Sequence, residues 1–114
     1  MVAEAEYLMV KFFSTDSGNE PVREWLKGLP DEERRRIGED VKTVQYGWPL
    51  GMPLVKPMGG GLFEIRTDLD NKIARVLICF NDNQIVLLHG FIKKTQKTPD
   101  SDLKIAKVRK KEIK

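Results

Sequence analysis

Apolar and polar positions divide the first half of the chain into one strand and two helices. Residues 7–13, YLMVKFF, are apolar almost throughout and rich in strand formers, which predicts an interior strand. Asn19 as a cap and Pro21 in the first turn predict the start of a helix. A second helix should begin at the acidic residues 31–33 and end near Tyr46. The apolar positions with helical spacing are Val22, Trp25, Leu26 and Leu29 in the first helix and Ile37, Val41 and Val44 in the second.

The second half of the chain predicts strands and a final helix. Residues 47–61 hold three prolines and five glycines, which favours a loop. Alternating patterns separated by Asp/Asn turns predict strands at 62–66, 72–80 and 84–91, and residues from about 100 to 114 have a helical composition. The order β-α-α-β-β-β-α indicates an α+β fold, with a mainly antiparallel four-stranded sheet, a helical hairpin on one face and a C-terminal helix. A length of 114 residues predicts a single domain, 1–114.

Positive charge is concentrated at the end of the chain. Residues 93–114 carry nine Lys/Arg and three Asp/Glu, whereas residues 1–50 carry seven and ten. Such a block is either a solvated tail or a surface for an anion, and composition alone leaves both open.

Other chemistry is poorly supported. Cys79 is the only cysteine and lies in the apolar run VLICF, so we expect a buried, inert thiol and no intrachain disulfide. One histidine and scattered carboxylates offer no metal-ligand spacing, and we expect no metal or other cofactor. The N-terminus lacks the pattern of a signal peptide, and no apolar stretch is long enough for a membrane span. We therefore expect a soluble cytoplasmic protein that does not bind a membrane.

Two arginines should meet on one face of the sheet. If the hairpin closes symmetrically about Asp70 and Asn71, Arg66 lies opposite Arg75. Like charges paired across strands destabilise a sheet unless an anion is close. Glu64, on the same face, is one candidate for that anion and a bound ligand is the other.

The only histidine, His89, follows in the last strand. A regular two- or four-residue turn at Asp82 and Asn83 would place it on the face opposite the arginines, and a bulge would place it beside them. A hydrogen-bonded core residue and a catalytic residue are both compatible with this position.

Three motifs carry a family resemblance: GLFEIR (61–66), ARVLICF (74–80) and LLHGFIKKTQKTP (87–99), the last followed by a basic helix. Together with the preceding helical hairpin, they resemble the phage-derived branch of the RelE/HigB toxin superfamily. The resemblance implies the toxin of a type II toxin–antitoxin pair. Such a protein is a metal-independent, ribosome-dependent endoribonuclease that cuts translated mRNA and is silenced by a helix-turn-helix antitoxin. It leaves the oligomeric state open.

The resemblance matches catalytic basic residues of the family to Arg66, Arg75 and Lys93 (or Lys94). The chemistry of RNA cleavage adds His89 as a catalytic acid or base if it faces the arginines. The residues expected to bind RNA are Lys56, Lys94, Gln96 and Lys97. The C-terminal tyrosine of some RelE-like proteins has no counterpart, because the only tyrosines are Tyr7 and Tyr46. If Arg75 is catalytic, Arg75→Ala should abolish toxicity and leave folding intact. A non-catalytic RNA- or ribosome-binding module on the same fold is the alternative.

Overall fold

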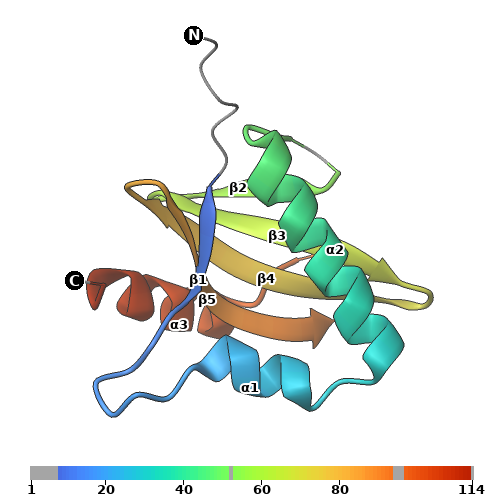
Figure 1. Cartoon of the computed structure of the whole chain (residues 1–114), viewed down its shortest axis with the longest axis horizontal. Helices are drawn as coiled ribbons and strands as arrows, with labels where there is room; N and C mark the ends of the chain where they lie inside the picture. Colours follow the sequence, from blue (N-terminus) through green and yellow to red (C-terminus); the bar gives the residue numbers. More distant parts are fainter. Residues whose placement is uncertain (1–7, 52, 94–96, 114) are drawn as a thin grey trace, which may run out of the picture.

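The predicted α+β fold class is confirmed in a computed structural model that describes residues 8–51, 53–93 and 97–113 (Figure 1). The elements in chain order are β1 (Met9–Phe12), α1 (Pro21–Lys27), α2 (Asp31–Gly47), β2 (Val55–Gly59), β3 (Leu62–Leu69), β4 (Lys72–Asn81), β5 (Gln84–Lys93) and α3 (Asp100–Lys111). No helix within these described ranges is both long and apolar enough to cross a bilayer.

The strands form one mixed sheet in the order β1-β5-β4-β3-β2. The strands from β2 to β5 pair antiparallel, and β1 pairs parallel to β5. The prediction that residues 7–13 form an interior strand was wrong, because β1 lies at one edge. Its side chains alternate between exposed and half-buried, and Met9 is largely exposed.

The opposite edge is β2, in a region predicted to be a loop. Its register pairs Val55 with Ile65 and Lys56 with Glu64. An edge strand tolerates Pro57, because proline lacks only the N–H group that would bond to one neighbour. The glycines that favoured a loop form the turn instead: Gly59, Gly60 and Gly61 all have positive φ. In the described part of the chain, the sheet therefore has five strands rather than four.

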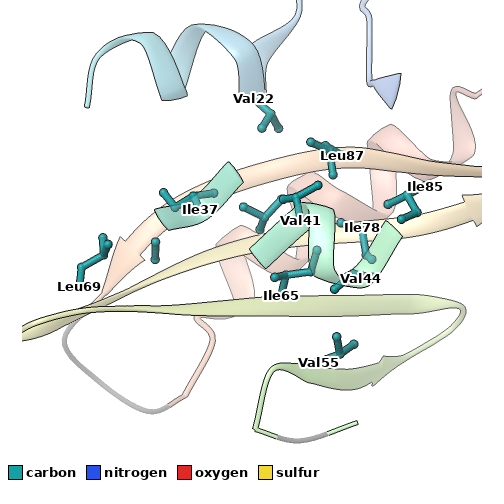
Figure 2. Close-up of a cluster of buried hydrophobic side chains, with 12 residues drawn as sticks. Val22, Ile37, Val41, Val44, Val55, Ile65, Leu69, Ile78, Ile85 and Leu87 are labelled. Carbon is teal, nitrogen blue, oxygen red and sulfur yellow. The ribbon is translucent and has the colours of Figure 1, made fainter. Parts of the chain in front are cut away.

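The helices α1 and α2 cover one face of the sheet, as Figure 1 shows for α2 in front of the strands. The predicted inward positions of α2, Ile37, Val41 and Val44, are all buried. Figure 2 shows them in one cluster with Ile65 and Ile78, and Val22 of α1 near Leu87 of β5. The two helices pack on different strands, α1 on β5 and α2 on β3.

The start of α1 differs from the prediction. The N-cap position is Glu20, not Asn19, and no side chain caps the helix. The backbone N–H of Asn19 instead donates to the Thr15 hydroxyl in the preceding turn. Pro21 does occupy the first turn, where its missing N–H costs nothing.

The third helix, α3, lies on the other face of the sheet. There Ala106 packs in a second apolar cluster with Leu77, Cys79 and Leu88. The prediction of a buried Cys79 is confirmed. Burial raises the pKa of the Cys79 thiol, and the charge of Lys110 opposes this in part.

Candidate functional site

Arg66 and Arg75 are directly paired across β3 and β4, as the sequence predicted. The connecting hairpin closes with Asp70 in the left-handed region (φ 61°) and pairs Leu69 with Lys72. Paired residues share a face, and Leu77, two positions after Arg75, belongs to the cluster under α3. Both arginine side chains therefore lie on the α3 face of the sheet.

Glu64 lies on this same face and is the counter-charge of both arginines. Its Oε1 is 3.7 Å from Nη1 of Arg75 and 3.8 Å from Nε of Arg66. The side chains of Glu64 and Arg75 have no exposed surface, whereas that of Arg66 is 13% exposed. Glu64 thus takes the place that the sequence analysis suggested for an acidic neighbour of the arginines.

Thr98, just before α3, closes the cluster. Its hydroxyl accepts a hydrogen bond from Nη1 of Arg75 (3.2 Å) and donates one to Oε2 of Glu64. The side chain is buried. We call Glu64, Arg66, Arg75 and Thr98 the buried charge cluster.

Burial dominates the electrostatics of Arg75. Loss of solvation lowers the pKa of its guanidinium, the Glu64 carboxylate acts in the opposite direction, and the charge of Arg66 lowers it further. With no exposed surface, Arg75 cannot touch a substrate in this conformation. Arg66 is the arginine of the pair that reaches the surface.

Next to Arg66 is a cavity of about 540 Å³ at the open edge of β3. Arg66 and Arg36 are its cationic lining residues, and the acidic ones are Glu39, Asp40 and Asp68. Because both signs of charge line the cavity, it is not a uniformly cationic groove for a polyanion.

A bulge in β5 decides the orientation of His89. The turn at Asp82 and Asn83 pairs Asn81 with Gln84, but the register shifts after Ile78↔Leu87 so that Leu77 faces His89. Leu88 is the inserted residue. The bulge is thus the predicted case that places His89 on the face of the arginines, with its ring stacked on Phe91 at 5.5 Å between centroids.

Both ring nitrogens of His89 contact charged side chains of α3. Nε2 lies 2.7 Å from Oδ1 of Asp102, and Nδ1 lies 3.4 Å from Nη1 of Arg109. Since a guanidinium can only donate, we assign the ring proton to Nε2, which donates to the carboxylate. Arg109 also donates to the Leu88 carbonyl oxygen at 2.8 Å, so these contacts hold α3 against the bulge of β5.

The lysines of the predicted site lie around this face. Lys93 is exposed at the end of β5 and pairs with Ile73, next to the row that contains Arg75. Lys56 on β2 pairs with Glu64, and Lys97 is exposed. Lys94 and Gln96 lie outside the described residues, so their predicted roles stay predictions. Lys104, Lys107 and Lys111 are exposed on α3.

Sequence reasoning missed three residues that organise the site: Thr98, Asp102 and Arg109. Asp102 lies in the first turn of α3, where Pro99 holds the N-cap position and none of the described side chains caps the helix. One signal was available: Asp102 and Arg109 are two helical turns apart and so lie on one side of α3. For Thr98, nothing local indicates that its hydroxyl joins a strand glutamate to a strand arginine.

Comparison with known proteins adds one relationship. The family model described as "Phage derived protein Gp49-like (DUF891)" matches residues 24–111, which is more than half of the chain and includes the buried charge cluster, His89 and all of α3. No curated protein matches the chain.

Proposed function

We propose that this chain, which belongs to the phage-derived Gp49-like family, is the toxin of a type II toxin–antitoxin pair and cuts translated mRNA on the ribosome. The family membership supports a toxin-like module. The RelE/HigB resemblance of GLFEIR, ARVLICF and LLHGFIKKTQKTP supports the narrower activity, the cytoplasmic site of action and a helix-turn-helix antitoxin as partner.

The chemistry requires little of the protein. In RNA cleavage by the neighbouring 2′-OH, the substrate supplies the nucleophile and no metal is needed. The protein has to align the backbone and stabilise the additional negative charge of the transition state. Arginine and lysine side chains can do both through charge-assisted hydrogen bonds to phosphate oxygens.

One observation carries the proposal: Arg66 reaches the surface from a sheet face on which its counter-ion is buried. In this function Arg66 binds the scissile phosphate and Lys93, two residues after Phe91 on the same face, stabilises the transition state. Lys56, Lys97 and the exposed lysines of α3 hold the RNA backbone or ribosomal RNA, and we extend that role to Lys94 and Gln96.

His89 takes a different role from the expected one. A general acid or base needs a ring nitrogen within reach of the reacting atoms, and the partners of both nitrogens belong to α3. We therefore assign His89 to holding α3 in place.

The test is expression in bacteria with mapping of the 5′ ends of translated transcripts. Wild-type protein should stop growth and create new 5′ ends within reading frames. Arg66→Ala should remove both effects, whereas Arg23→Ala, which deletes an exposed arginine on α1, should remove neither. Growth arrest without new 5′ ends would refute the nuclease.

That outcome would favour the alternative, a module on the same fold that binds RNA or the ribosome without cutting. Two observations speak for it: Arg75 has no exposed surface, and both ring nitrogens of His89 contact α3. A binder should co-sediment with ribosomes in a salt-sensitive way and leave the transcripts intact.

A further inference from the structure

We propose that Glu64 is a positioning residue whose buried carboxylate fixes the guanidinium of Arg66, and that Arg75 is the buried counter-ion of Glu64 and does not contact RNA. The inference rests on the proposed function in one respect only: it takes Arg66 as the phosphate ligand. In this inference Arg75 does not bind the substrate. It helps to hold Glu64, which in turn positions Arg66.

The geometry divides the two oxygens of Glu64 between two tasks. Oε2 accepts the hydrogen bond from Thr98. Oε1 is buried, has no hydrogen-bond partner within the described residues, and lies almost equally far from Arg66 (3.8 Å) and Arg75 (3.7 Å). One oxygen thus anchors the carboxylate, and the other presents its charge to both guanidinium groups.

The charged side chains of the cluster compensate one another. A buried carboxylate is costly unless a positive charge lies close to it, and the fully buried Arg75 supplies that charge. Two directly paired arginines repel each other, and the carboxylate between them offsets the repulsion.

The cluster meets solvent at Arg66. Arg75 and Glu64 have no exposed surface, so the 13% exposed Arg66 side chain is where an anion can reach the cluster. Glu64 and Arg66 are two residues apart on β3, and this spacing holds the carboxylate and the guanidinium on the same face of a rigid element. An Arg66 side chain supported in this way is already in position to bind a phosphate group before the RNA arrives.

The decisive variant is Glu64→Gln, which keeps the shape and removes the charge. Cleavage would be measured in a purified translation system, per folded molecule, with the folded fraction taken from circular dichroism. We expect kcat to fall on the order of 100-fold, because a displaced Arg66 guanidinium is no longer aligned with the phosphate in the transition state. The KM for ribosomes should change less than about twofold, because other basic residues make that contact. The matched control is Val44→Ala, which destabilises the opposite face of the sheet and should keep the wild-type kcat per folded molecule.

A second variant, Glu64→Asp, keeps the charge and withdraws it by one methylene group. It covers the case in which Glu64→Gln does not fold, and its kcat should lie between those of Glu64→Gln and the wild type. A wild-type kcat per folded molecule for either variant would overturn the proposal, since the position of Arg66 would then not depend on Glu64.

A measurement without RNA separates this inference from the proposed function. The Nε–H resonances of Arg66 and Arg75 in the NMR spectrum should shift in Glu64→Gln and exchange faster with water, and they should stay in place in Val44→Ala. One outcome is that the wild type does not cut RNA while the Arg66 and Arg75 resonances still shift in Glu64→Gln. In that case the proposed nuclease activity is wrong, but the positioning of Arg66 by Glu64 is upheld. Unchanged resonances in Glu64→Gln would refute the positioning of Arg66 by Glu64, whether or not the protein cuts RNA.

Discussion

The guanidinium of Arg75 and the carboxylate of Glu64 lie 3.7 Å apart with neither side chain exposed to solvent. This buried pair lies on the same face of the sheet as Arg66, whose side chain reaches the surface. This burial supports our proposal that Arg75 has a structural role, so the stability of any Arg75 variant should be measured before its activity is interpreted.

Arg75→Ala should unfold or severely destabilise the protein, contrary to the expectation from the sequence that folding stays intact. Removing one partner of a buried ion pair costs about 3–5 kcal/mol, because the other charge remains buried without compensation. Urea unfolding measures this loss. The double variant Arg75→Met/Glu64→Gln should lose less than the sum of its single variants, and additive losses would show that the two residues are not coupled.

Asp102→Asn and His89→Gln should each lower the free energy of unfolding by about 1–2 kcal/mol, because each breaks the contact that joins α3 to β5. Hydrogen exchange should show faster opening of α3 in both variants, while the amides of α2 serve as the internal control. If His89 is instead the general acid or base, His89→Gln would abolish cleavage at unchanged stability and Asp102→Asn would not reproduce that loss.

Gly90→Ala should be destabilising by about 1–3 kcal/mol, because overpacking forces neighbouring groups apart. A Cβ at Gly90 would clash with the ring of Trp25, one of the side chains with which α1 packs on the sheet. The matched control is Gly38→Ala in α2, where a Cβ meets open space and helix propensity should add about 0.5–1 kcal/mol. Thermal unfolding of both variants gives the comparison, and a Gly90→Ala protein as stable as the wild type would contradict the packing of α1.

The burial of Cys79 should make stability depend on pH above the ordinary thiol pKa of 9.0. Because burial raises the pKa of the folded thiol, the unfolded chain loses its proton first as the pH rises. The contribution is therefore complete below pH 9.0 and decreases above it. Urea unfolding at several pH values should show the wild type losing stability relative to Cys79→Ala above that pH. A difference that does not vary with pH would contradict this.

Some features followed from the sequence because they depend on neighbours along the chain. The inward face of α2 follows from the helical spacing of Ile37, Val41 and Val44, and the pairing of Arg66 with Arg75 follows from a two-residue turn. Local rules were insufficient for β2, because Pro57 is compatible with a strand only at a sheet edge and the position of the edge is not local.

By itself, the sequence determined the α+β class, the antiparallel β3–β4 register and the placement of two arginines on one face, since these follow from side-chain periodicity and short turns. Only the tertiary structure decided which arginine is accessible and how His89 is oriented. Thr98, 23 residues further along the chain, accepts a hydrogen bond from the buried Arg75, and one inserted residue in β5 moves His89 to the α3 face. Burial and bulges depend on which distant segments pack together, so no local pattern encodes them.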